Sequence, residues 1–177
     1  YRNKGYLDFQ ISNYKLVKSK NIFNKPINKL ELNLKSGTRY YINDIIVSGN
    51  YIFNDSTLKS KIILQKDDVY DGLKYDLSNM NLTNLYRDKG YLFTIINSNI
   101  IPINDSLLNI KFDVNEKSVV HVNKVIIRGN ETTKENVIRR DIDITPGKIF
   151  SQSEIMESYR KLYIRYSRRS GKYYISR

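Results

Sequence analysis

The chain has 177 residues, and its 30 Lys and Arg residues outnumber its 18 Asp and Glu residues, which gives a formal net charge of +12. Hydrophobic residues make up 40% and aromatic residues 12%, enough to form packed cores and too many for a disordered chain. The absence of Cys excludes disulfides, thiolate zinc sites and cysteine nucleophiles, and the single His, His121, excludes a metal site that needs two histidines.

Two strands are predicted in the first 50 residues. The leucines of residues 30–34 alternate with polar residues, which is the pattern of a strand with one covered face. The segment Tyr40–Ser48 is rich in β-branched and aromatic residues and ends at Gly49-Asn50, a turn signal. We therefore expect a strand on each side of residue 37.

Two helices are predicted after these strands. The segment Asn54–Leu64 carries apolar residues at helical spacing behind Asn, Asp and Ser, which favour helix starts. A longer helix is predicted from Asp71 to Lys89, and Gly90 follows it where a left-handed residue commonly ends a helix. The apolar face of this helix is expected to comprise Leu73, Leu77, Met80, Leu85 and Tyr86, with Tyr75 and Leu82 beside them.

Two further strands are predicted at Tyr91–Ile101 and Leu107–Val114. The second alternates apolar and polar residues along its whole length. The order of elements is then β-α-α-β-β, with one face of a three-stranded sheet covered by two helices, which is an α+β class. Such a unit is small, so its core is marginal without neighbouring units.

The same order of elements recurs along the chain. Tyr41–Asn50 returns as His121–Asn130, at an offset of about 80 residues, and Tyr1–Leu7 returns as Tyr86–Leu92, at an offset of about 85. In the later copy, Ser151–Glu154 is a capping box at the matching start of the long helix. We expect the end of one unit at residues 1–36, a complete unit at 37–117, and the start of another at 118–177, whose third strand is absent.

A tandem β-α-α-β-β unit of this length, with a first strand ending in V-x-G-N and a long helix ending in Y-R-x-K-G-Y-L, resembles POTRA (polypeptide-transport-associated) domains. The likeness is strongest to the BamA-type family of bacterial outer-membrane protein assembly factors. The motifs that carry it are Tyr1–Leu7, Ile46–Asn50, Tyr86–Leu92, Ile126–Asn130 and Ile144–Gly147.

The resemblance implies a scaffold at the periplasmic face of the bacterial outer membrane, attached to an outer-membrane barrel outside this chain. Its implied partners are unfolded outer-membrane protein clients and accessory lipoproteins. Its implied mechanism is β-augmentation, in which a client segment pairs as an extra strand with an exposed sheet edge. The family pattern places that edge on Tyr91–Ile101, and on Tyr6–Leu16 in the first partial unit. The candidate edge residues are Tyr91, Leu92, Phe93, Thr94, Ile95, Ile96 and Asn97, with Tyr6, Asp8 and Gln10 in the partial unit.

Two other functions are compatible with parts of the sequence. The segment from Arg160 to Arg177 is basic, contains tyrosines and has no acid, so a nucleic-acid-binding repeat protein is one alternative. Against it, the repeat has no RNP-type aromatic pair and no GXXG loop. The other alternative is the POTRA arm of a protein-export transporter of the same superfamily.

No catalytic, cofactor or metal site is predicted, and no run of apolar residues is long enough for a membrane helix. Asp67-Asp68 and Asp141-x-Asp143 are the carboxylate pairs that could be imagined as metal ligands. Both flank predicted helix ends, where Asp commonly bonds the backbone. Neither pair recurs in the other unit, since Lys61 and Lys148 stand at the corresponding positions.

Overall fold

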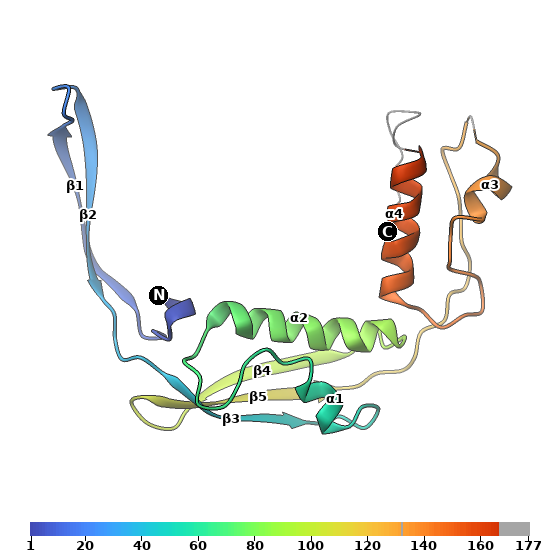
Figure 1. Cartoon of the computed structure of the whole chain (residues 1–177), viewed down its shortest axis with the longest axis horizontal. Helices are drawn as coiled ribbons and strands as arrows, with labels where there is room; N and C mark the ends of the chain where they lie inside the picture. Colours follow the sequence, from blue (N-terminus) through green and yellow to red (C-terminus); the bar gives the residue numbers. More distant parts are fainter. Residues whose placement is uncertain (132, 167–177) are drawn as a thin grey trace. The chain divides into compact units, whose positions relative to one another are not determined.

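The computed structural model describes residues 1–131 and 133–166 of the chain (Figure 1). None of the helices in this part is both long and apolar enough to span a membrane. The mixture of strands and helices confirms the α+β class predicted from the sequence. The elements are η1 (Arg2–Lys4), β1 (Gln10–Lys20), β2 (Pro26–Lys35), β3 (Tyr41–Ser48), α1 (Asp55–Lys59), α2 (Gly72–Asp88), β4 (Ile95–Pro102), β5 (Leu107–Asn115), α3 (Glu135–Arg139) and α4 (Gln152–Tyr166).

The chain divides into two compact units. The first comprises Tyr1–Ser48, Asp55–Asn79 and Asn97–Asp113, and the second comprises Gly49–Asn54, Met80–Ile96 and the chain from Val114 onward. This division passes through the complete sequence repeat. Each unit therefore contains one of the two places where consecutive repeats meet.

Strands β3, β5 and β4 form a three-stranded sheet in that order. β3 and β5 are parallel, with Tyr41 opposite Leu107 and a register shift between Ile42 and Asp44. Because side chains alternate between the two faces of a strand, β5 presents a single apolar row to one side of the sheet. The members of this row are all buried, as its period of two predicts: Leu108, Ile110, Phe112 and Val114.

Helix α2 supplies the cover of this apolar row in the first unit. The Tyr75 ring stacks on the Phe112 ring at 6.1 Å between centroids, and the Tyr75 hydroxyl donates a hydrogen bond to Ser98 Oγ at 2.7 Å. The helix ends at Asp88, within one residue of its predicted end. Helix α1 is shorter than predicted, and Leu58 is its buried residue.

The buried stripe of α2 differs from the predicted apolar face. Leu73 is 55% exposed and Met80 is 51% exposed, although both were expected on the covered face. Ser78 is fully buried instead, because its hydroxyl accepts a hydrogen bond from Ile63 N at 3.0 Å and donates one to Lys74 O at 2.7 Å. The stripe follows helical spacing through Tyr75, Ser78, Leu82 and Tyr86.

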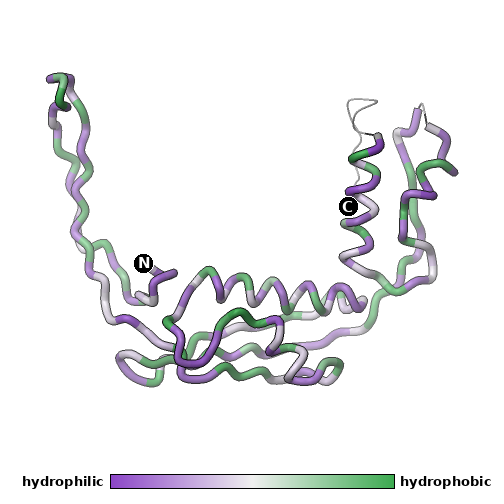
Figure 2. The backbone as a smooth tube through the Cα atoms, in the orientation of Figure 1, coloured by the Kyte–Doolittle hydropathy of each residue, from purple (hydrophilic) through white to green (hydrophobic). Residues whose placement is uncertain are grey.

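Strands β1 and β2 form an antiparallel hairpin in the first unit, and apolar and polar residues are interspersed along both strands (Figure 2). A bulge between Ile11 and Asn13 brings Ile11 opposite Leu34, so the apolar row of β1 faces the same side as that of β2. All six side chains of this combined row are exposed: Ile11, Tyr14, Leu16, Leu30, Leu32 and Leu34.

The third repeat forms its helices but not its first strand. Residues 121–128 were expected to be a strand like β3, yet His121 makes only an isolated bridge with Ile149. β3 owes its pairing to β5, and the counterpart of β5 would follow α4, beyond the described residues. Residues 167–177 lie outside the described residues as well.

Candidate strand-addition edge

The predicted edge strand begins at Ile95 rather than at Tyr91. Residues 91–94 form a turn in which Thr94 N donates to Tyr91 O at 3.3 Å. The start of this turn is fixed by the end of α2, because Tyr91 N donates to Tyr86 O at 3.0 Å across the left-handed Gly90. Of the candidate edge residues, Tyr91, Leu92, Phe93 and Thr94 thus precede the strand, and Ile95, Ile96 and Asn97 open it.

The candidate residues of the partial repeat lie mostly outside a strand. Tyr6 makes one isolated bridge with Arg39, and Asp8 accepts a hydrogen bond from the Tyr40 hydroxyl at 2.9 Å. Only Gln10 belongs to β1, which starts there and not at Tyr6 as expected. Tyr6 and Asp8 therefore hold the hairpin to the next repeat.

Strand β4 lies at one edge of the three-stranded sheet, and among the described residues no strand pairs with its outer side. Ser98 faces the helices, since its Oγ is bonded by the Tyr75 hydroxyl at 2.7 Å and by Asn79 Nδ2 at 2.6 Å. The alternate residues face the open side, and Ile95 and Ile101 are 50% and 45% exposed there. The backbone of β4 thus has an accessible edge.

The two edges of this sheet are protected to different degrees. Exposed edge strands are commonly guarded against pairing by charged residues, Pro or bulges. β3 carries Asp44 at its register shift, whereas β4 reads Ile-Ile-Asn-Ser-Asn-Ile-Ile-Pro, with no charge and a Pro only at Pro102, its last residue. β4 is therefore the edge that the sequence leaves open to pairing.

A carboxylate network around Glu116 fixes the end of α2 in the second unit. Glu116 accepts hydrogen bonds from the Tyr86 hydroxyl at 2.7 Å, and from Tyr51 N and Ile52 N at 3.1 Å each. Burial of the phenol, together with its bond to Glu116, raises the pKa of Tyr86. The Tyr86 ring also packs edge-on against Tyr91 at 6.2 Å. Sequence reasoning missed Glu116, whose only signal is a carboxylate placed directly after an alternating strand.

The two joints between consecutive repeats have the same backbone hydrogen bonds. We call the contact of Gly5 with Tyr40 the first joint and that of Gly90 with Val120 the second joint. In each, the glycine is left-handed, with φ of 88° for Gly5 and 89° for Gly90. The glycine carbonyl accepts a hydrogen bond at 2.9 Å from the backbone N–H of Tyr40 in the first joint and of Val120 in the second. A side chain on Gly90 would overlap Ile149 Cγ2. The Y-R-x-K-G-Y-L motif is thus a joint-forming motif.

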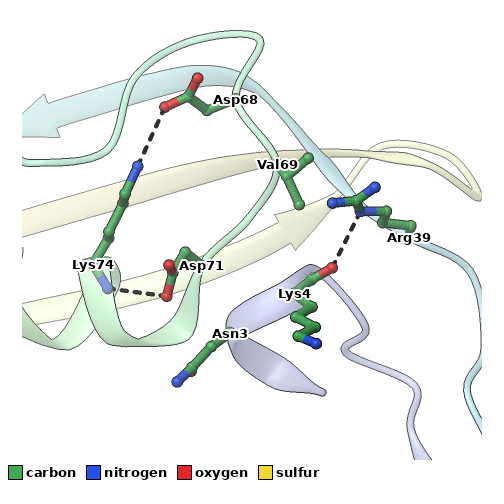
Figure 3. Close-up of a pocket in the computed structure, with 7 residues that line it drawn as sticks. All are labelled: Asn3, Lys4, Arg39, Asp68, Val69, Asp71 and Lys74. Atoms are coloured by element: carbon green, nitrogen blue, oxygen red, sulfur yellow. Dashed lines mark hydrogen bonds and ion pairs between the residues drawn. The ribbon is translucent and has the colours of Figure 1, made fainter.

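A charged cleft of about 350 Å³ lies beside the first joint (Figure 3). It is lined by Asn3, Lys4, Arg39, Asp68, Val69, Asp71 and Lys74. Lys74 Nζ lies 3.7 Å from Asp68 Oδ2, and Arg39 Nε donates to Lys4 O at 3.2 Å. Asp71 caps α2 by accepting from Leu73 N at 2.8 Å. The charged groups of Arg39, Asp68, Asp71 and Lys74 are engaged with one another and with the backbone, so we assign the cleft to the joint.

The carboxylates of Asp68, Asp141 and Asp143, which were considered as metal ligands, are engaged by basic side chains. Asp141 pairs with Arg165 and Asp143 with Lys161, each at 2.7 Å. Within residues 1–131 and 133–166, no group of three His, Cys, Asp or Glu residues could hold a metal ion. The basic residues of α4 considered for nucleic-acid binding are likewise paired, because Arg160 bonds Glu157 at 2.7 Å. Residues 167–177 of that basic segment lie outside the described part.

A family model described as "POTRA: Surface antigen variable number repeat" matches residues 40–117 and 120–174. A Treponema pallidum (strain Nichols) protein named as an outer membrane protein assembly factor is 28% identical over 165 residues, which cover 92% of this chain and 20% of that protein. The outer membrane protein assembly factor BamA of Nitratidesulfovibrio vulgaris is 28% identical over 134 residues, covering 73% of this chain and 17% of its own length. The chain thus spans about a fifth of these relatives.

The fold is similar to that of POTRA domains 3–5 of Haemophilus influenzae BamA. The crystal structure of that segment matches with a TM-score of 0.72 at 16% identity, covering 91% of this chain and 63% of the other. At this identity the match concerns the fold. It confirms the tandem β-α-α-β-β arrangement expected from the repeats.

Proposed function

The chain belongs to the POTRA family, and from this premise we propose that it is part of a periplasmic scaffold that binds polypeptides during outer-membrane protein assembly. The names of its relatives support this role. The proposed domains are residues 1–36, 37–117 and 118–177, followed in the whole protein by an outer-membrane barrel. The proposed location is the periplasmic face of the bacterial outer membrane.

Client segments are proposed to bind by pairing with the outer edge of β4. The observation that carries this assignment is an accessible eight-residue edge strand without a single charged residue. Main-chain hydrogen bonds supply the affinity in such pairing, so many client sequences are tolerated. Accessory lipoproteins of an assembly complex are proposed as further partners of the same kind of edge.

The test is a titration of the isotopically labelled chain with extended peptides from outer-membrane proteins, followed by amide chemical shifts. Binding is expected to be micromolar or weaker and to shift the amides of residues 95–101 while leaving those of β3 in place. Shifts in β3 or elsewhere, without shifts in β4, would overturn the assignment.

Matched variants sharpen this test. Asn97→Lys with Asn99→Lys places two charges on β4, and we expect about a threefold loss of affinity for a neutral peptide, because lysines on an edge strand oppose pairing. The control is Asn13→Lys with Asn33→Lys, an exposed cross-strand pair of the β1–β2 hairpin. It should bind as the unchanged chain does.

A further inference from the structure

An open apolar hollow of about 870 Å³ lies at the start of β4 in the second unit. Its lining comprises Phe93, Ile95, Glu116, Lys117, Ser118, Val119 and Val120. Phe93 is 64% exposed and Ile95 is 50% exposed, so neither side chain is needed to fill the core. Clustered exposed apolar side chains of this kind mark binding surfaces more often than chance surface residues do.

The first joint has no such apolar lining. At the positions that correspond to Phe93 and Val119, the first joint carries Asp8 and Arg39. Asp8 is bonded to the Tyr40 hydroxyl at 2.9 Å, and Arg39 Nε to Lys4 O at 3.2 Å. Since the two joints share their backbone hydrogen bonds, the apolar lining of the second is not a requirement of joint formation.

The charged groups of the hollow leave one cation available. Glu116 is occupied by Tyr86 and by the amides of Tyr51 and Ile52. Lys117 is exposed and makes no ion pair with another described residue. The hollow therefore favours an apolar group with a negative charge next to it.

We propose that this hollow receives an aromatic or large apolar side chain of the client segment that pairs with β4, with an acidic residue of that segment placed against Lys117. Ile95 belongs both to β4 and to the hollow, so a strand paired with β4 that continues past Ile95 reaches it. This inference rests on the proposed strand addition and assigns to it a side-chain preference.

The test compares three extended peptides that share one neutral host sequence. The first carries Phe-Asp, the second Ala-Asp and the third Phe-Asn. Each peptide is made in two versions, with the pair shifted by one residue, so that in one version the Phe or Ala side chain faces the hollow. Burying the phenyl group should make the first peptide bind about tenfold more tightly than the second. The third should bind about twofold more weakly than the first at low salt only, because an exposed ion pair is screened.

Variants of the chain locate the effect. Phe93→Ser and the isosteric Val119→Thr should reduce the preference for Phe over Ala, and Lys117→Gln should remove the preference for Asp over Asn. The control is Ile101→Thr, which changes an exposed isoleucine of β4 that is not part of the hollow. This control should keep both preferences.

The outcomes separate the two levels of the hypothesis. Equal binding of all three peptides, with shifts in the β4 amides, would overturn the proposed role of the hollow while leaving strand addition intact. A Phe preference that survives Phe93→Ser and Val119→Thr would also overturn it, by placing the aromatic contact elsewhere. Binding of none of the peptides would overturn both.

Discussion

At the scale of single residues, Glu116 connects three parts of the second unit. Its carboxylate accepts from the Tyr86 hydroxyl and from two backbone amides of the loop after β3. Tyr86 ends the buried stripe of α2, and its ring contacts Tyr91 in the turn before β4. Glu116 thereby helps to position the start of the proposed binding edge.

Replacing Glu116 by Ala should lower the free energy of unfolding by about 1–3 kcal/mol, because the buried Tyr86 hydroxyl loses its acceptor. Urea denaturation measures this change. Glu31→Ala is the matched control, since Glu31 makes an exposed pair with Lys29 and its loss should cost less than about 1 kcal/mol. Combining Glu116→Ala with Tyr86→Phe should cost less than the sum of the two separate losses, and strict additivity would contradict the network.

The raised pKa of Tyr86 makes stability depend on alkaline pH. The folded state favours the protonated phenol, so this contribution is complete below the unfolded pKa near 10 and is lost as the pH rises through the raised folded value. In Tyr86→Phe the free energy of unfolding should therefore fall less steeply above about pH 10 than in the unchanged chain. Urea denaturation at a series of pH values tests this, and identical slopes would refute it.

At the scale of elements, the left-handed glycine after each Y-R-x-K motif joins one repeat to the next. Gly90 has φ of 89°, and a Cβ at this position would overlap Ile149 and approach Val119 at 3.1 Å. Gly129 is also left-handed, with φ of 76°, but a Cβ there would meet no atom within 4 Å. These two glycines separate the cost of backbone strain from the cost of crowding at the joint.

Gly90→Ala should destabilise the chain by about 1–3 kcal/mol more than Gly129→Ala, because the added methyl crowds the joint in addition to the shared left-handed strain. Thermal or urea unfolding of the two variants measures the difference. Adding Ile149→Ala to Gly90→Ala should recover part of it. Equal losses in the two glycine variants would mean that the joint tolerates a side chain.

Elements whose pattern is local were predictable from the sequence. β5 follows strict alternation, and α2 ends two residues before its glycine, so both were predicted closely. The phase of the buried stripe was not, because a hydropathy pattern cannot show that Ser78 gains a backbone partner by burial. Ser158 repeats that role, accepting from Asp143 N at 2.9 Å. A serine at equal spacing in both long helices is a signal that could have been used.

The start of the candidate edge could not be read from composition. The segment Tyr91–Thr94 is apolar and aromatic, like the strand that follows, but its backbone is tied to the end of α2 by the bond from Tyr91 N to Tyr86 O. The first strand of the third repeat was wrongly predicted for a related reason. A strand needs a partner, and the partner of β3 comes from β5, far along the chain.

At the scale of the whole molecule, tandem repetition was the feature that led from sequence to family. It was visible because two motifs recur with fixed offsets, and the family match over residues 40–117 and 120–174 agrees with it. Sequence and structure contribute different evidence to the proposed function. Repetition identifies the type of domain, whereas the sheet order identifies β4 as the accessible, uncharged edge.

The central claim is that clients are recognised through their backbone by the edge of β4. Alternate residues of an added strand direct their amides toward the sheet, so N-methylation of one alternate set of peptide amides should weaken binding by about tenfold or more, while methylation of the other set leaves it nearly unchanged. Fluorescence anisotropy with the two methylated peptides and their unmethylated parent gives the three affinities directly. A marked difference between the two sets is the predicted result, and equal affinities of both methylated peptides would contradict strand addition.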